Sequence, residues 1–192
     1  METLQVNIQT ITLRGPIPGY ILGEQLGAGG FGEVWRATAP GGLAKAIKIV
    51  YGHMQSKLAS QELKALQKIK EVRHPMLLSL ERIETVGEHL VIVMELADGS
   101  LRDRQAEKEA AGLPGIPRDE LMAYMRDAAD VMDYLVEQHS LLHLDIKPEN
   151  LLLVADRVKV ADFGLMRELG DADSSPTGGV TPLYAAPEIF DA

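Results

Sequence analysis

A glycine-rich segment with β-favouring residues on both sides places the strongest constraint on the fold. Residues Leu26–Val34 read LGAGGFGEV, which matches the pattern G-x-G-x-x-G-x-V, and the run Val34–Thr38 that follows favours a strand. Glycine has no Cβ, so backbone N–H groups in such a loop can approach phosphate oxygens. In a dinucleotide-binding Rossmann unit the last glycine would open a helix. Because a strand follows here, the sequence predicts a glycine-rich hairpin that covers phosphates.

The first half of the chain is rich in strand-like runs. Alternating and β-branched residues predict strands at Tyr20–Leu26, Glu33–Ala39, Leu43–Val50, Leu77–Ile83 and His89–Leu96. A helix is predicted from Ser56 to Val72. The breaker cluster Gly15–Gly19 indicates that residues 1–19 are a lead-in segment and that the folded domain starts near Tyr20.

The second half, which begins after Asp98–Ser100, has a helical character. Arg118–His139 is predicted to be an amphipathic helix that starts after Pro117. Its apolar residues recur at steps of four and three residues and are Leu121, Met125, Ala128, Met132 and Leu135. Short runs at Leu151–Val154 and Arg157–Val160 predict a hairpin, and the Gly-, Asp-, Ser- and Pro-rich end of the chain predicts an extended loop.

Composition excludes several classes of function. The 192 residues include 19 Lys and Arg against 28 Asp and Glu, a net charge of −9, so the basic field of a nucleic-acid binder is missing. With no cysteine, neither a disulfide framework nor a thiolate metal site is possible. No apolar run has the length of a membrane span, and no secretory signal follows Met1. We therefore expect a soluble cytoplasmic domain.

A lysine interrupts an otherwise apolar strand. Side chains alternate along a strand, so both faces of Ala46–Val50 are apolar except at Lys48. A lone lysine of this kind more often extends its amine to water. The position of Lys48, sixteen residues after Gly32, instead favours a phosphate ligand.

A glutamate lies on the apolar stripe of the predicted 56–72 helix. Glu62 shares this stripe with Leu66 and Ile69. A buried carboxylate without a partner is costly, and Lys48 is the obvious partner. Glu71 is about half a turn out of phase and should face solvent.

The strongest chemical signal lies in His143–Asn150, followed by Asp162-Phe163-Gly164. Asn150 and Asp162 offer oxygen ligands of the kind that Mg²⁺ takes. Asp145 can accept a hydroxyl proton, and Lys147 can offset charge on a transferring phosphoryl group. Asp and Asn are also common in turns, but turn preference does not explain why these residues occur together after a glycine loop and a strand lysine.

These motifs resemble those of the eukaryotic-type protein kinases, and the resemblance runs from about Tyr20 to Glu188. Ala186-Pro187-Glu188 supplies the last motif in the family's order. The resemblance implies an α+β fold. Its N-lobe, residues 20–96, would have a five-stranded antiparallel sheet and one main helix. A hinge at 97–100 and a partial, mainly helical C-lobe at 101–192 would follow.

The resemblance also implies ATP and Mg²⁺ as cofactors and gives the site residues their roles. The nucleotide would contact Leu26, Gly27, Gly29, Gly32, Val34, Ala46, Lys48, Met94, Glu95, Ala97, Ser100 and Leu152, with Met94 as gatekeeper, backbone groups of Glu95 and Ala97 at the adenine edge, and Ser100 near the ribose. Asn150 and Asp162 would bind the metal. Asp145, Lys147, Lys48, Glu62 and Thr181 would act in catalysis, and Lys147 with Thr181 resembles the serine/threonine branch.

Three features depart from the family pattern. Leu144 replaces the arginine that normally precedes the catalytic Asp and grips an activation-loop phosphate, so control by loop phosphorylation is not expected. Glu62 lies twelve residues before His74, not the usual nine, which is nearly one extra helical turn. The family's later C-lobe helices would follow Ala192.

An active serine/threonine kinase, acting on protein hydroxyls and not on nucleic acid, is the leading interpretation. A nucleotide-binding pseudokinase or scaffold and an inactive truncated fragment remain as alternatives. The sequence identifies neither the protein substrate nor the oligomeric state.

Overall fold

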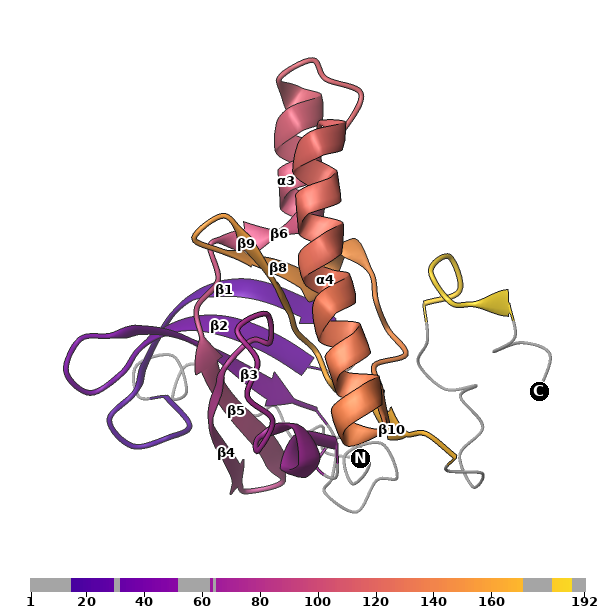
Figure 1. The fold of residues 1–192 in the computed structure, drawn as a ribbon. Coiled ribbons are helices and arrows are strands. Elements are labelled where there is room, and N and C mark those ends of the chain that lie inside the picture. Colours follow the sequence, from indigo (N-terminus) through magenta and orange to yellow (C-terminus); the bar gives the residue numbers. More distant parts are fainter. Residues whose placement is uncertain (1–14, 30–31, 52–62, 64, 171–180, 188–192) are drawn as a thin grey trace, which may run out of the picture. The chain divides into compact units, whose positions relative to one another are not determined.

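The computed structural model describes residues 15–29, 32–51, 63, 65–170 and 181–187 (Figure 1). The chain divides into two compact units, Met1–Ser60 with Ser79–Leu96 and Gln61–Leu78 with Ala97–Ala192. In the described part of the chain, no helix is both long and apolar enough to cross a membrane.

The first unit is built on an antiparallel sheet of five strands. In chain order these are β1 (Ile21–Gly29), β2 (Gly32–Thr38), β3 (Ala44–Val50), β4 (Leu80–Val86) and β5 (His89–Glu95), arranged β1-β2-β3-β5-β4 (Figure 1). The five predicted strands are confirmed, but β4 begins at Leu80 and not at Leu77. The residues before it pair elsewhere: Leu78 N–H donates to the Val160 carbonyl (2.9 Å), and Val160 N–H donates to the Met76 carbonyl (2.8 Å).

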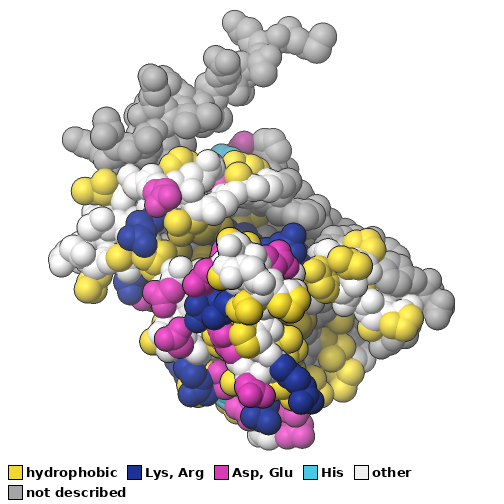
Figure 2. All heavy atoms as spheres, turned by 90° about the horizontal axis from the view of Figure 1, so that it is seen from above, with side chains coloured by type: hydrophobic (Ala, Val, Ile, Leu, Met, Phe, Trp, Pro, Cys, Tyr) yellow, Lys and Arg dark blue, Asp and Glu magenta, His cyan; other side chains and the backbone are white. Residues whose placement is uncertain are grey.

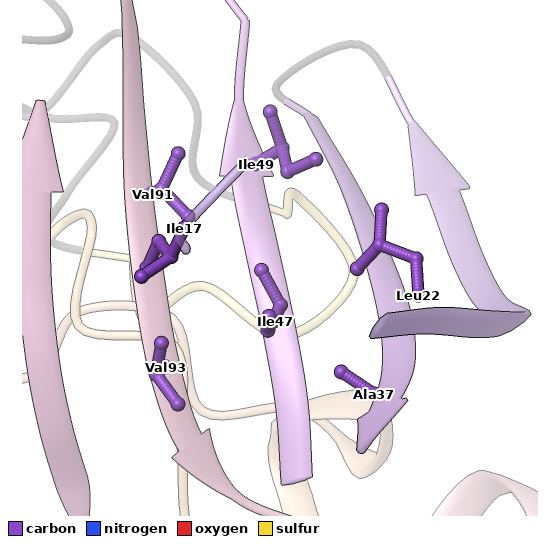
Figure 3. Packing of buried hydrophobic residues seen from close by; sticks show 7 residues of the cluster. All are labelled: Ile17, Leu22, Ala37, Ile47, Ile49, Val91 and Val93. Atoms are coloured by element: carbon purple, nitrogen blue, oxygen red, sulfur yellow. The ribbon is translucent and has the colours of Figure 1, made fainter. Parts of the chain in front are cut away.

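One face of this sheet carries the apolar core of the first unit. Its buried side chains are Ile17, Leu22, Ala37, Ile47, Ile49, Val91 and Val93 (Figure 3). Ile17 is fully buried although it precedes Tyr20, where we expected the folded domain to start. Gly15 N–H bonds the Tyr20 carbonyl (2.8 Å), and Tyr20 N–H bonds the Ile17 carbonyl (3.2 Å). The breaker cluster is therefore a tight turn that places Ile17 in the core, where a fully buried side chain contributes about 1.5–3 kcal/mol.

The described part of the second unit contains two long helices, a helical segment at residues 65–69 and two small β-sheets. The helices are α3 (Leu101–Ala110) and α4 (Arg118–His139), and the 3-10 turn η1 spans Pro148–Asn150. One sheet has the order β6-β8-β9, formed by Gly99–Ser100, Leu151–Val154 and Arg157–Val160; a second pairs β7 (Leu141–Leu142) with β10 (Arg167–Glu168). The predicted bounds of α4 and of the β8–β9 hairpin are confirmed.

The buried face of α4 differs from the predicted one. Ala128 and Leu135 are buried as expected, but Tyr124 and Val131 complete the buried stripe, while Leu121 and Met125 are 37% and 41% exposed. The apolar arc of this helix is wider than the face that is buried, so two registers were compatible with the pattern. Sequence reasoning favoured Leu and Met over Tyr. In the structure the Tyr124 hydroxyl donates to Glu120 (3.0 Å), which satisfies its polar end.

An ion pair fixes α4 against β9. The guanidinium of Arg157 donates two hydrogen bonds of 2.7 Å to the two carboxylate oxygens of Asp127. These bonds hold the pKa of Asp127 below its usual range, although partial burial opposes the shift. Such a bidentate pair sets direction as well as energy, so it helps select which side of α4 is buried.

Arg104 of α3 connects three elements of the second unit. Its Nε lies 2.8 Å from Glu120 of α4, and its Nη2 lies 3.2 Å from Asp156 in the β8–β9 turn. That turn consists of Ala155 and Asp156, with φ of 49° and 58°. Ala155 N–H donates to the Asp98 carboxylate (2.9 Å). Acidic and basic side chains are likewise intermixed on the face drawn in Figure 2.

The described end of the predicted 56–72 helix supports its assigned register. Residues 65–69 are helical; Ala65, Leu66 and Ile69 are buried, and Glu71 is exposed as predicted. Glu62 lies outside the described residues, so its pairing with Lys48 stays a prediction.

Candidate active site

The glycines of the hairpin formed by β1 and β2 differ in their surroundings. A Cβ at Gly27 or Gly29 would have no heavy atom within 4 Å, so this backbone is open to an approaching group. At Gly32, with φ of +155°, a Cβ would lie 2.3 Å from the Ile49 carbonyl oxygen of β3. Gly27 and Gly29 therefore suit a phosphate ligand, whereas Gly32 is required by strand packing.

Leu26 marks an irregularity in the hairpin. The register shifts between Gln25, which pairs with Trp35, and Gly27, which pairs with Val34, so Leu26 is the extra residue of a bulge. A bulge increases the local twist of the strand pair. The Leu26 side chain is largely exposed.

The sheet face opposite the core carries the predicted nucleotide-binding side chains of the first unit. Lys48 pairs directly with Val34 of β2 and with Ile92 of β5, and Ala46 pairs with Met94. Residues paired across an antiparallel ladder share a face, so Val34, Ala46, Lys48 and Met94 lie on one side and Ile47 and Ile49 on the other. The alternation predicted for β3 is thereby confirmed.

Side-chain and backbone bonds define the segment from Glu95 to Ser100. Glu95 N–H donates to the Ser79 carbonyl (3.1 Å), and the Glu95 carboxylate accepts from Ser79 N–H (2.8 Å). After Ala97, Asp98 N–H donates to the Leu153 carbonyl (2.8 Å). The backbone contacts of Glu95 and Ala97 to the adenine edge stay predictions.

Ser100 has a structural task that sequence reasoning missed. It is the N-cap of α3: its hydroxyl accepts from Asp103 N–H (3.2 Å), and its own N–H donates to the Asp103 carboxylate (2.8 Å). A serine followed three residues later by an acid, ahead of a helix, would have predicted this cap. The ribose contact of Ser100 stays a prediction. Its ladder partner Leu152 is only partly buried, whereas Leu151 and Leu153 are buried.

The structure brings three predicted catalytic residues and one predicted metal ligand into one hydrogen-bonded group. Asp145 is 9% exposed, and its Oδ2 lies 2.7 Å from Nζ of Lys147. Asn150 Nδ2 donates to the same Oδ2 (2.9 Å) and to the Asp145 carbonyl (2.8 Å). Thr181 Oγ1 donates to Asp145 Oδ1 and accepts from Lys147 Nζ, both at 3.0 Å. A buried carboxylate that accepts hydrogen bonds from a cation and from two neutral donors is fixed in orientation.

His143 positions Asp145, a role that the sequence motif did not reveal. Its Nε2–H donates to the Ala161 carbonyl (2.9 Å), so Nδ1 is free to accept from Asp145 N–H (3.3 Å). Burial lowers the pKa of His143, which keeps the ring neutral and in this tautomer, although the bond to Ala161 partly opposes the shift. The ring also meets Phe163 edge to face, with centroids 5.8 Å apart. A histidine two residues before a loop Asp was the available signal.

Asn150 and Asp162 fit a cation that is shared with a ligand. The Asn150 amide nitrogen is bonded to Asp145, which leaves the oxygen Oδ1 as its metal ligand atom. Asp162 is exposed and has a φ of 59°, in the left-handed region. Among the described residues no three His, Asp or Glu side chains gather as a metal cage. Mg²⁺ is commonly held by one or two carboxylates together with substrate phosphates, and Asn150 and Asp162 offer oxygen ligands of the kind that it takes.

Comparisons with known proteins agree with this geometry. A family model described as the protein kinase domain matches residues 20–192. The SNF1-like protein kinase ssp2 of Schizosaccharomyces pombe is 33% identical over 176 residues, covering 90% of this chain and 30% of that protein. Serine/threonine-protein kinase ATG1a of Arabidopsis thaliana is 32% identical (89% and 28% covered), and tyrosine-protein kinase Srms of Mus musculus is 34% identical (90% and 34%).

The chain thus spans about a third of the length of these relatives. The glycine hairpin, the β3 lysine and the group around Asp145 all lie within the residues that the family model matches. The chain belongs to the protein kinase family.

Proposed function

We propose that this chain carries the ATP-binding and catalytic machinery of a protein kinase that phosphorylates serine and threonine hydroxyls of proteins. The observation that carries the proposal is the group in which Asp145 is bonded to Lys147, Asn150 and Thr181. In this group the Asp145 carboxylate, the proposed proton acceptor, is bonded to the cation of Lys147 and to Asn150, the proposed metal ligand.

The proposed reaction is phosphoryl transfer from ATP. The substrate hydroxyl oxygen forms a bond to the γ-phosphorus, the bond from that phosphorus to the β–γ bridging oxygen breaks, and ADP leaves. Asp145 accepts the hydroxyl proton, and Lys147 offsets the negative charge on the transferring group. Thr181 holds both side chains in place. Asn150 and Asp162 would hold Mg²⁺, whose charge would stabilise the phosphate oxygens.

The remaining predicted residues would bind the nucleotide. Backbone amides near Gly27 and Gly29 would contact phosphates, with Lys48 as their cationic partner. Val34, Ala46 and Leu152 would offer apolar contacts to the adenine, and the Glu95 carbonyl and Ala97 backbone would bond its edge. The assignments of Val34, Ala46 and Lys48 are supported by the sheet register, which places these residues on one face.

Specificity for serine and threonine is supported by the Lys147–Thr181 bond. The relatives include both a serine/threonine and a tyrosine kinase by name, so the acceptor must be measured. The test is transfer of labelled phosphate from ATP to a mixed peptide library, followed by identification of the phosphorylated residue. Phosphotyrosine alone would contradict the proposal.

The same assay tests the catalytic group. Asp145→Asn should lower the transfer rate about 10²–10⁴-fold, since general-base catalysis contributes that much. Asp133→Asn, on an exposed position of α4, is the matched control and should leave the rate unchanged. An unchanged rate in Asp145→Asn would refute the assigned base.

A nucleotide-binding protein without transfer activity is a second candidate. The observation in its favour is the exposed apolar side of α4, where Leu121, Met122, Met125 and Val136 are 37–42% exposed. Exposed apolar patches often mark protein–protein interaction sites, as a scaffold would need. Mg²⁺-dependent ATP binding without any transfer would support this candidate.

A further inference from the structure

The tip of the glycine hairpin is joined to β3 by polar side chains. Gln25 of β1 donates from Nε2 to the Glu33 carboxylate of β2 (3.0 Å). Tyr51, the residue after β3, follows Ile49 by two positions and so lies on the same face as Glu33, the ladder partner of Ile49. Its hydroxyl interacts there with the Glu33 carboxylate. The Glu33 carboxylate therefore connects all three strands at the point where the hairpin extends beyond the sheet.

This connection lies on the sheet face away from Lys48. Glu33 pairs with Ile49 and Gln25 pairs with Trp35, whose partner on β3 is Ile47. Ile47 and Ile49 belong to the core face (Figure 3). Val34 and Lys48, which we assign to the nucleotide, point to the other face. Gln25, Glu33 and Tyr51 therefore act on the hairpin without touching the nucleotide.

Among the described residues nearest the hairpin turn, 23–29 and 32–36, no side chain is fully buried. The buried core residues of β1 and β2 are Leu22 and Ala37, both distant from the turn in the strand register, and β1 is exposed from residue 23 to residue 29. Gly27 and Gly29 have no side chains, and Leu26 lies in the bulge. Trp35 of β2 packs against the core cluster on this face. Closer to the turn, the position of the described part of the hairpin relative to β3 depends on the backbone ladder and on the interactions of Glu33.

The bonds are of the stronger kind. An ionised carboxylate accepts from a phenol and an amide, and hydrogen bonds to charged groups exceed neutral ones in strength. Partial burial, and then the bond to Glu33, raises the pKa of Tyr51, so its hydroxyl remains a donor at neutral pH.

We propose that Gln25, Glu33 and Tyr51 are positioning residues for nucleotide binding, which hold the glycine hairpin at the angle in which its open backbone at Gly27 and Gly29 can receive phosphates. The inference rests on the proposed kinase function for its readout. When a binding-competent conformation is only partly populated, the apparent affinity falls by that fraction. We call the interactions among Gln25, Glu33 and Tyr51 the brace. Loss of the brace therefore raises the KM for ATP and leaves kcat nearly unchanged.

The test compares Tyr51→Phe, Glu33→Gln and Glu33→Ala in steady-state kinetics. Tyr51→Phe removes one bond and keeps the ring, and we expect the KM for ATP to rise about three- to tenfold, the effect of one such hydrogen bond. Glu33→Ala should raise it more than Glu33→Gln, which retains an acceptor oxygen. Tyr20→Phe is the control, because Tyr20 packs against the core cluster.

Two outcomes would overturn the proposal. Equal KM values in wild type, Tyr51→Phe and Glu33→Ala would show that the brace has no part in binding. A lower KM in Glu33→Ala would show that the charge of Glu33 repels the nucleotide more than its bonds organise the hairpin.

Amide hydrogen exchange separates this inference from the proposed function. Tyr51→Phe and Glu33→Ala should speed exchange of the hairpin amides about three- to tenfold in the nucleotide-free protein, and Tyr20→Phe should not. Faster exchange in a protein that binds no ATP would support the brace and refute the kinase assignment. Unchanged exchange in a protein that binds ATP would refute the brace alone.

Discussion

Replacing Gly32 by alanine is expected to damage the fold, whereas the same change at Gly29 should damage only nucleotide binding. The new Cβ at Gly32 would lie 2.3 Å from the Ile49 carbonyl oxygen, while ordinary van der Waals contact begins at 3.4 Å. The obstacle is backbone of a central strand, so it cannot rotate away. A residue forced into such a conformation costs about 1–3 kcal/mol. At Gly29 nothing lies within 4 Å.

The assay is thermal unfolding of both variants together with titration of ATP. A loss of about 1–3 kcal/mol lowers Tm by roughly 2–12 °C in a chain of this size. Gly32→Ala should show this shift, and Gly29→Ala should keep the wild-type Tm but bind ATP more weakly. Equal Tm values for Gly32→Ala and wild type would refute the steric argument. A lower Tm in Gly29→Ala would refute the assignment of an open backbone there.

Three further predictions concern the catalytic residues. Lys48→Met should abolish transfer with a small effect on Tm, because the apolar stem is retained; unchanged turnover would contradict its role. His143 has a folded pKa below that of the unfolded chain, so its contribution to stability is present above about pH 6.5 and is lost as pH falls below it. Urea unfolding at pH 7.5 and 5.5 should show this slope in wild type and a flatter one in His143→Gln. Because Leu144 cannot bind a phosphate, phosphatase treatment should leave the transfer rate unchanged, and a large drop would show that loop phosphorylation matters.

Local signals predicted the elements well where they were unambiguous. The alternation of Ala46–Val50 and the start of α4 after Pro117 have single interpretations, and the structure confirms them. The prediction of which side of α4 is buried was wrong, because an apolar arc broader than the contact face allows more than one register. The predicted start of β4 was too early because Met76 and Leu78 bond to Val160. This partner lies more than eighty residues away, and no local pattern shows it.

The features of the candidate site likewise divide into those that the local sequence predicts and those that depend on distant contacts. Asp145, Lys147 and Asn150 lie within six residues, so their proximity follows from the sequence. The bond from Lys147 to Thr181 joins residues that are 34 positions apart, and it was expected only from the family resemblance. The different reasons for Gly29 and Gly32 depend on where β3 lies, and the motif cannot distinguish them.

The two-residue turn between β8 and β9 has a practical consequence for producing this protein. Ala155 and Asp156 both have positive φ, the geometry of a type I′ turn, which prefers Asn followed by Gly. Asp156 is engaged by Arg104, but the methyl group of Ala155 offers the turn nothing. Ala155→Asn should keep the N–H donor to Asp98 and raise stability by about 1 kcal/mol, as urea unfolding would show. Neither turn residue belongs to the proposed catalytic set, so the exchange is a means to better expression and longer-lived samples for inhibitor screening.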